Sequence, residues 1–284
     1  MIVFVILHYQ ALEETKTCVE TIMDRVLTEK RIVIVDNCSP NKSGELLQDF
    51  YQNYQEIKVE LLDSNVGFAK GNNIGYRMAK LYNPQYIIVM NNDVLIDSYD
   101  LEFLLEEAFR DSSFDILGPD IISTRDGIHQ NPQRLRNFSL EELKRKYISL
   151  KLKNCLTPLL RIKYMIPFLC RNRKKGSNYI DHPVEDVVLH GACYIYSHKF
   201  IADHENCLFD GTFMYFESYI LHYLALREGI KLVYDPRITV KHHEDVSTDL
   251  TYGRGYKKAV FSNRCLLESC RVFMEVIQDQ AVRI

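Results

Sequence analysis

Short apolar runs alternate with longer segments of helical spacing through the first 120 residues. We expect strands at Ile2–His8, Ile32–Asp36, Lys58–Leu62, Tyr86–Asn91 and Ile116–Pro119. We expect helices between them at Thr15–Leu27, Ser43–Tyr54, Gly71–Tyr82 and Tyr99–Arg110. Strands that alternate with helices of this length are typical of βαβ units, so the sequence predicts an α/β fold with a mainly parallel sheet flanked by helices.

The alternation resumes after Val184. The expected elements are strands at Val187–Leu189 and Cys193–Tyr196, a helix at Tyr215–Glu228, and strands at Lys231–Tyr234 and Thr239–Lys241. Apolar residues at helical spacing from Gly255 to Ile277 predict one or two further helices. These helices could pack on the parent domain, on a second copy of the chain or on a membrane, and the sequence leaves all three open. We therefore predict one domain over residues 1–250 and a C-terminal helical extension over residues 251–284.

Composition narrows the class of protein. The chain has 284 residues, of which 46% are hydrophobic, and this is enough to bury a proper core. The net charge of −3 argues against nucleic acid as the main partner. Eight scattered cysteines without a CxxC pair fit a reducing cytoplasm better than a disulfide framework. Met1–Leu7 lacks a basic leader, so we expect a strand there and not a signal peptide, and we expect no transmembrane helix.

A basic segment interrupts the pattern between residues 143 and 180. It holds eleven lysines and arginines interleaved with apolar residues and no acidic residue: Lys144, Arg145, Lys146, Lys151, Lys153, Arg161, Lys163, Arg171, Arg173, Lys174 and Lys175. Such a segment can lie on an anionic membrane surface, where each cation adds about 1 kcal/mol. A helical insertion whose cations face water is the alternative, and both interpretations stay open.

Polar residues follow the apolar strands at three junctions. Asp36 ends one strand, Asn91–Asp93 ends another, and the segment Asn65–Asn73 between them is rich in asparagine and glycine. Any one of these could be an ordinary turn. All three in order favour a nucleotide and metal site, because open α/β sheets bind ligands at the carboxyl ends of their strands. The patterns GxxxxGK[ST] and GxGxxG are absent, which argues against a kinase or a dehydrogenase.

Asp93 is the best candidate for a metal ligand. Hard divalent cations prefer carboxylate oxygens, and one aspartate at a strand end suits Mg²⁺ or Mn²⁺ held jointly with a diphosphate. Other residues near it are expected to contact the nucleotide. Asp36 would accept hydrogen bonds through its carboxylate, and Asn72 and Asn73 would bind polar groups through their amides. Gly67 and Gly71 would let the backbone approach the nucleotide closely.

These segments together resemble the family-2 inverting glycosyltransferases of the GT-A fold. The resemblance rests on Val35–Ser39, Asn65–Asn73 and Asn91–Asp93, and is supported by His190–Ala192, Phe213–Glu217 and Val240–His242 in the order that this family uses. Within the family, the chain is most similar to bacterial rhamnosyltransferase-like enzymes of surface-polysaccharide assembly. The resemblance covers roughly residues 1–250, outside the basic insertion and the C-terminal helices.

The resemblance implies a GT-A-type, Rossmann-like sheet and a set of roles. Donor-binding residues, for a UDP- or dTDP-linked sugar, would be Asp36, Asn37, Asn65, Gly67, Phe68, Lys70, Gly71, Asn72, Asn73, Asn91 and Asn92. Asp93 and His242 would hold Mg²⁺ or Mn²⁺, with His243 open as the alternative to His242. The acceptor would be bordered by His190, Gly191 and Ala192.

Glu217 is the expected catalytic base. The family usually places a Glu-Asp pair after the aromatic run and often another acid two residues later, whereas this chain has Glu217-Ser218-Tyr219-Ile220. A serine cannot take up a proton unaided near neutral pH, which leaves Glu217. The alternative is that Glu217 only places a negative charge at the start of a helix, which is favourable there.

The implied function is a metal-dependent, inverting hexosyl- or deoxyhexosyltransferase for capsule, O-antigen or another surface polysaccharide. Its acceptor would be a saccharide, lipid-linked at the inner face of the cell membrane, where the protein would be cytoplasmic or peripheral. A homodimer through the C-terminal helices is a further expectation. Two other functions stay open. A sugar nucleotidyltransferase would carry a glycine- and arginine-rich loop where this chain has His8–Leu12, and a non-catalytic nucleotide-sugar or glycan-binding homologue is favoured by Ser218.

Overall fold

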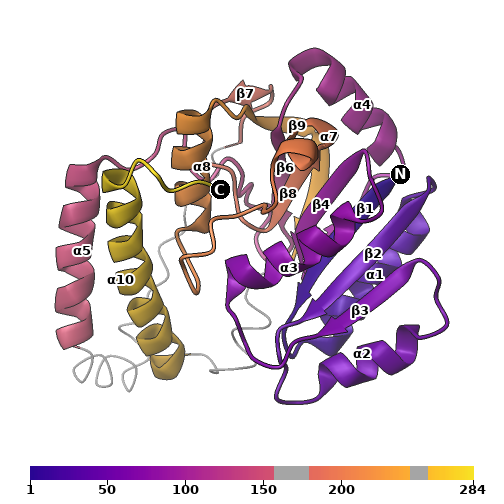
Figure 1. Ribbon diagram of the computed structural model, residues 1–284, viewed down its shortest axis with the longest axis horizontal. Coiled ribbons are helices and arrows are strands. Elements are labelled where there is room, and N and C mark those ends of the chain that lie inside the picture. Colours follow the sequence, from indigo (N-terminus) through magenta and orange to yellow (C-terminus); the bar gives the residue numbers. More distant parts are fainter. Residues whose placement is uncertain (157–178, 244–254) are drawn as a thin grey trace.

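The computed structural model describes residues 1–156, 179–243 and 255–284, which build a central sheet between layers of helices (Figure 1). The first half runs β1 (Ile2–His8), α1 (Leu12–Arg25), β2 (Lys30–Asp36), α2 (Ser43–Tyr51), β3 (Ile57–Leu61), α3 (Phe68–Lys80) and β4 (Tyr86–Asn91). The strands lie in the order β3-β2-β1-β4 and all pair in parallel, as the alternation predicts.

The second half adds strands of both directions. Its elements are β5 (Val94–Ile96), α4 (Leu101–Ser112), β6 (Ile116–Ser123), α5 (Leu140–Cys155), β7 (Val184–Glu185), β8 (Cys193–Ser197), α7 (His198–Asp203), α8 (Glu217–Glu228), β9 (Leu232–His242) and α10 (Tyr256–Gln278). The order continues from β4 through β8, β6 and β9 to β5, with β7 also paired to β9. β8 is antiparallel to both neighbours, so this half is mixed whereas the first half is parallel.

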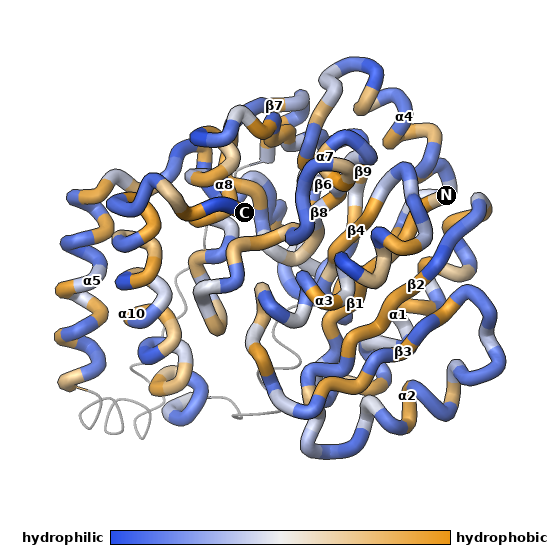
Figure 2. The backbone as a smooth tube through the Cα atoms, viewed as in Figure 1, coloured by the Kyte–Doolittle hydropathy of each residue, from blue (hydrophilic) through white to orange (hydrophobic). Residues whose placement is uncertain are grey.

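Both faces of the sheet are covered. Side chains of β1 from Ile2 to Ile6 are fully buried, as expected for a parallel strand with helices on both sides. One core lies under α1, α2 and α4, and a second lies under α3, α7 and α8. Figure 2 shows mostly hydrophobic residues along β1, β2 and β4, and hydrophobic residues alternating with hydrophilic ones along the helices.

A third core joins α5, α8 and α10. α5 begins with a capping box, in which the hydroxyl of Ser139 accepts from the backbone of Glu142 while the Glu142 carboxylate accepts from the backbone of Ser139. Phe273 of α10 and Leu143 of α5 are fully buried in this core. α10 thus docks on its own chain as a single helix. A dimer through α10 would use its opposite face and stays a prediction.

Several expected elements differ in the structure. The strand predicted at Val187–Leu189 is wrong, because Val188 makes only a single bridge to Arg134. The two strands predicted within residues 231–241 are one strand, β9, whose pairing with β6 shifts beside Pro236. β5 and α7, which are short, had no signal of their own in the sequence. The second part of the predicted basic insertion, residues 157–178, lies outside the described residues. Within the described ranges, no helix is both long and apolar enough to cross a membrane.

Candidate active site

A cavity of about 510 Å³ opens at the carboxyl ends of β1 and β4. It brings together eleven of the residues that the sequence predicts for the site: Asn37, Asn65, Gly67, Phe68, Asn91, Asn92, Asp93, His190, Gly191, Ala192 and Glu217. Its lining also includes residues for which the sequence predicts no role in the site, among them Tyr9, Gln133, Lys146 and Tyr219. Residues far apart in the chain therefore meet where α/β sheets bind ligands.

The loop before α3 is held in place by asparagine side chains. Asn37 donates through Nδ2 to the carbonyl of Gly67 (3.2 Å) and accepts through Oδ1 from the backbone N–H of Val66 (2.9 Å). Gly67 has φ +90°, and a Cβ there would lie 2.5 Å from the carbonyl oxygen of Phe213. Glycine is therefore required, because this loop touches the backbone of the opposite wall.

Other predicted donor-binding residues are used for packing. Asn73 donates to the carbonyl of Leu208 (2.7 Å) and accepts from the backbone N–H groups of Cys207 (3.1 Å) and Leu208 (3.0 Å). A Cβ on Gly71 would lie 2.5 Å from the side chain of Leu7 in β1. The physical reason is that α3 begins at Phe68 instead of Gly71, which turns these positions inward.

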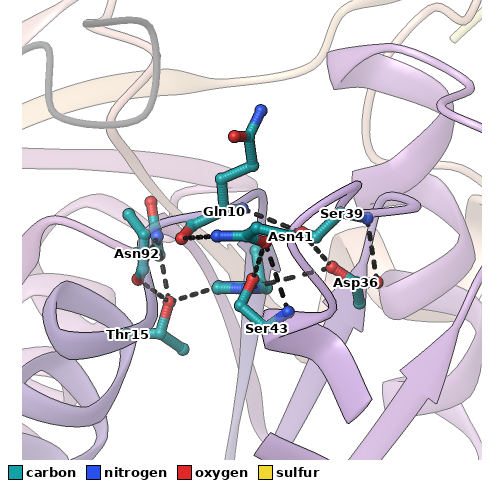
Figure 3. Close-up of polar contacts among 9 residues, drawn as sticks. Gln10, Thr15, Asp36, Ser39, Asn41, Ser43 and Asn92 are labelled. Carbon is teal, nitrogen blue, oxygen red and sulfur yellow. Dashed lines mark hydrogen bonds and ion pairs between the residues drawn. The ribbon is translucent and has the colours of Figure 1, made fainter. Parts of the chain in front are cut away.

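Three more predicted positions do not line the cavity. Lys70 is exposed, and Asn72 is buried with its Nδ2 donating to the carbonyl of Phe68 (3.0 Å). Asp36 is buried and accepts from the backbone N–H and the hydroxyl of Ser39 (Figure 3). Burial raises the pKa of the Asp36 carboxyl, and the bonds from Ser39 oppose that shift. A contact from Asp36 to a nucleobase stays a prediction.

A buried polar network under the cavity was not foreseen from the sequence. His8, at the end of β1, lies between the hydroxyls of Thr15 (Nδ1–Oγ1 2.6 Å) and Ser43 (Nε2–Oγ 2.8 Å). Thr15 also accepts from Nδ2 of Asn92 (2.9 Å), as Figure 3 shows. Burial lowers the pKa of His8 to about 4, so its ring is neutral near pH 7 and links the hydroxyls as one donor and one acceptor. The network thereby fixes the Asn92 amide at the cavity.

Asp93 and His242 form a pair suited to a divalent cation. Both are buried, and Oδ1 of Asp93 lies 3.2 Å from Nε2 of His242 but has no aligned hydrogen-bond donor in the part of the chain that is described. Nδ1 of His242 lies 2.8 Å from the amide oxygen of Gln130 and so carries the proton when the ring is neutral, which turns the Nε2 lone pair toward Asp93. His243 instead contacts Glu14 (3.3 Å).

This donor set fits Mg²⁺ or Mn²⁺. Oxygen and imidazole ligands suit both ions, and Mg²⁺ commonly keeps several waters and phosphate oxygens beside one or two carboxylates. Among the described residues no cluster of three His, Cys, Asp or Glu side chains could hold a metal alone. A cation here would therefore take its remaining ligands from a bound diphosphate and water.

Glu217 enters the cavity from the first residue of α8. Its side chain is buried, and Oε1 accepts from the hydroxyl of Thr212 (3.2 Å). Burial raises the pKa of Glu217 to about 7, against the opposing effect of its hydrogen bonds. Tyr215 and Phe216, directly before it, have φ +74° and +69°. Such left-handed conformations cost about 1–3 kcal/mol each in residues other than glycine and concentrate at functional sites.

Ser218 stands where the family pattern has an acid. Its hydroxyl lies 2.8 Å from the hydroxyl of Tyr194, and a Cβ on Gly191 would lie 3.3 Å from it. The serine thus completes the packing between α8 and β8. Among the described residues that line the cavity, Asp93 and Glu217 are the two carboxylates.

Solved structures share the architecture. TarS 1–349 of S. aureus in complex with UDP-GlcNAc has a TM-score of 0.55 and 11% identity, over 99% of this chain and 68% of that one. The same protein in complex with UDP has a TM-score of 0.53 and 12% identity, over 88% and 62%. At such identities the likeness shows the fold alone. The fold is that of the GT-A glycosyltransferases, as expected.

Sequence relatives give the family. The chain is 27% identical over 101 residues to the uncharacterized glycosyltransferase EpsJ of Bacillus subtilis, a match over 36% of this chain and 28% of EpsJ. It is 27% identical over 90 residues to the glycosyltransferase GlyG of Streptococcus pneumoniae, over 32% and 29%. These matches span less than a third of each relative. Residues 3–172 match the family model for glycosyl transferase family 2, and the chain belongs to this family.

Proposed function

We propose that the protein transfers a hexosyl or deoxyhexosyl group from a nucleoside-diphosphate sugar to a saccharide acceptor, with inversion at the anomeric carbon. The observation that carries the proposal is one cavity with two buried carboxylates in different settings, Asp93 beside His242 and Glu217 with a raised pKa. The complexes of TarS with UDP and UDP-GlcNAc support a uridine nucleotide, although a dTDP sugar and a rhamnosyl group remain alternatives. A thermal-shift screen of UDP, dTDP and GDP with Mn²⁺ would identify the nucleotide.

The residues divide the chemistry between two sides of the cavity. Asp93 and His242 would hold Mg²⁺ or Mn²⁺ at the diphosphate, where the bound cation would offset charge on the leaving group. Amide groups of Asn65, Asn91 and Asn92 would bind polar groups of the donor. Glu217 takes the proton from the acceptor hydroxyl. The hydroxyl oxygen then attacks the anomeric carbon on the face opposite the diphosphate, which leaves as the nucleoside diphosphate. One direct displacement inverts the configuration.

The rate of transfer should depend on pH through Glu217. A general base acts only when ionised, and burial raises the pKa of Glu217 to about 7. The rate is therefore expected to fall about tenfold for each pH unit below that value and to level off above it. The acidic limb of kcat/KM against pH tests this. An apparent pKa near the usual 4.5 of a glutamate would contradict the assignment.

The main rival is a homologue that binds a nucleotide sugar or a glycan without turnover. Ser218 in place of an acid is the observation that favours it. Donor hydrolysis separates the two functions, since slow, metal-dependent release of the nucleoside diphosphate requires an enzyme. A sugar nucleotidyltransferase would instead release pyrophosphate from a nucleoside triphosphate.

Peripheral contact with an anionic membrane is part of the proposal, and α5 offers the surface for it. Ile148, Leu152 and Leu156 follow one another at intervals of four residues and are 58%, 58% and 52% exposed. Lys144 and Lys151 on the same helix are also exposed. An exposed apolar stripe with cations beside it suits a lipid surface at the inner face of the cell membrane, where the protein would meet a lipid-linked acceptor.

Sedimentation with vesicles tests this surface. Binding to anionic vesicles is expected to exceed binding to neutral ones and to weaken as salt rises, because salt screens surface charge. Leu152→Ser should weaken binding, whereas Leu226→Ser, at a 47% exposed leucine on α8, serves as the matched control. Equal partitioning to neutral and anionic vesicles would rule out the electrostatic contribution.

A further inference from the structure

Lys146 extends from α5 to the cavity on the side where Glu217 lies. Its Nζ is 5.8 Å from the ring centroid of Phe216, the residue directly before Glu217, and 5.2 Å from that of Phe138. Figure 1 shows α5 and α10 beside α8, away from β2 and β3. The helical wall that carries Lys146 is therefore the wall that carries the base, whereas Asp93 follows the end of β4.

The charge of Lys146 is not balanced by a carboxylate among the described residues. Its pKa is lowered by burial first and then by the cations Lys153 and Arg134, with only the thiol of Cys270 acting in the opposite direction. Arg134 lies 4.0 Å from the ring centroid of Phe138, which places a second cation at the same ring. Arg134 has Glu142 at 4.0 Å, whereas the described residues give Lys146 no ion pair. A half-buried cation in this setting favours an anion in the cavity.

Gln133 also lines the cavity, and its side chain carries a buried, unsatisfied acceptor. The backbone N–H of Gln133 donates to the carbonyl of Val188 (2.8 Å), which holds the residue in place. Its side-chain Oε1 is buried and lacks a hydrogen-bond donor among the described residues. A buried carbonyl oxygen without a donor is costly unless a ligand supplies one. Sugar hydroxyls are such donors. The lining thus offers one group for an anion and one for a hydroxyl.

We infer that the acceptor is an anionic saccharide, whose carboxylate or phosphate binds Lys146 while the attacking hydroxyl faces Glu217 and another hydroxyl donates to Gln133. The inference rests on the proposed function, since it assigns the acceptor of the same site. In the proposed function Asp93 and His242 would hold a cation at the donor diphosphate, beside the end of β4, whereas Lys146 lies on the side of Glu217, so the donor does not account for Lys146. The rings of Phe138 and Phe216 hold the ammonium group in place but do not neutralise it.

Binding of three probes tests the inference, each in the presence of UDP and Mn²⁺: octyl glucoside, octyl glucuronide and glucosyl octyl phosphate. For the natural sequence, at least one anionic probe should bind about tenfold or more tightly than the neutral one, as one charge-assisted hydrogen bond provides. Lys146→Gln should remove this preference, and Lys146→Arg should largely keep it. Lys58→Gln, which removes an exposed cation from β3, outside both the cavity lining and the α5 surface, should leave it unchanged. The tighter anionic probe tells whether the charge is on the sugar or on its linkage.

Equal affinity for neutral and anionic probes, no binding of either anionic probe, or a preference that survives Lys146→Gln would overturn the inference. Weaker binding of UDP with Mn²⁺ in Lys146→Gln would overturn it too, because Lys146 would then belong to the donor site. The preference is measured from binding alone. Failure of the proposed function would appear separately, as absence of UDP release from a donor sugar by the natural sequence.

Discussion

Replacement of Glu217 by glutamine is expected to lower sugar transfer about a hundred- to ten-thousand-fold while donor binding persists. The amide keeps the shape of the side chain and its oxygen still accepts from Thr212, but it cannot take the proton of the acceptor hydroxyl. Initial rates of UDP release and the Kd for donor, measured on the same preparation, separate the chemical step from binding.

Ser218→Ala is the matched control for this variant. It removes the contact with Tyr194 but no group that could take a proton, so its effect on the rate should be mild. If Glu217→Gln transferred sugar at nearly the original rate, the base would lie elsewhere. Asp210, which is outside the cavity lining, and Glu244, which is outside the described residues, would be the next candidates.

The same variant has an expected effect on stability. The pKa of Glu217 is raised in the folded protein, from 4.5 to about 7, so the folded state favours the protonated carboxyl. The contribution of the protonated Glu217 carboxyl to the free energy of unfolding is fully present below pH 4.5 and is lost as pH rises through 7. The shift corresponds to about 3 kcal/mol at about pH 8. Glu217→Gln should therefore be more stable than the original protein at that pH, by urea denaturation, and close to it at about pH 5.

Asp93→Asn is expected to abolish the metal-dependent part of the stabilisation by UDP. A ligand at a hundredfold excess over its Kd raises the free energy of unfolding by about 2.7 kcal/mol. Because Asp93 and His242 are the described side chains that meet at 3.2 Å beside the cavity, loss of the carboxylate should leave the cation without its anionic protein ligand. Thermal denaturation with UDP, with and without Mn²⁺, measures the difference.

The two adjacent histidines provide the control for the metal site. His242→Ala should also reduce the response to Mn²⁺, whereas His243→Ala should keep it, because His243 faces Glu14 and not Asp93. An unchanged Mn²⁺ response in Asp93→Asn would exclude Asp93 as the ligand. If His242→Ala and His243→Ala reduced the stabilisation by Mn²⁺ equally, the reduction would not be evidence that His242 binds the metal.

The strands were the most predictable part of the fold. β1 and β4 begin and end where their apolar runs do, because both are buried from both faces and so contain little but apolar residues. The predicted strand at Val187–Leu189 was wrong for the opposite reason. Its residues are buried and β-branched or aliphatic, yet the neighbouring chain at Arg134 allows only one bridge. Whether a buried apolar run forms a strand is therefore decided by the segment it pairs with, which is distant in sequence.

The sequence predicted which residue types gather at the site better than it predicted the role of each residue. Asn37 and Asn73 both belong to predicted donor segments, but only Asn37 lines the cavity, while Asn73 fixes the backbone at residues 207–208. A local pattern cannot tell an amide that binds a ligand from one that binds backbone far along the chain. His8 was missed because its partners Thr15 and Ser43 come from two helices. A histidine at the end of a buried strand was the available signal.

Donor turnover is the most direct test of the assignment as a whole. The protein is incubated with UDP-GlcNAc, dTDP-rhamnose or a GDP sugar, with Mn²⁺ or with a chelator, and released nucleoside diphosphate is measured over time. We predict that at least one donor is cleaved only when the metal is present, and that Glu217→Gln binds this donor but releases the nucleotide at least about a hundredfold more slowly. A protein that binds one of these donors and releases nucleotide from none would be a binding homologue, and the account of Asp93 and Glu217 as a catalytic pair would be wrong.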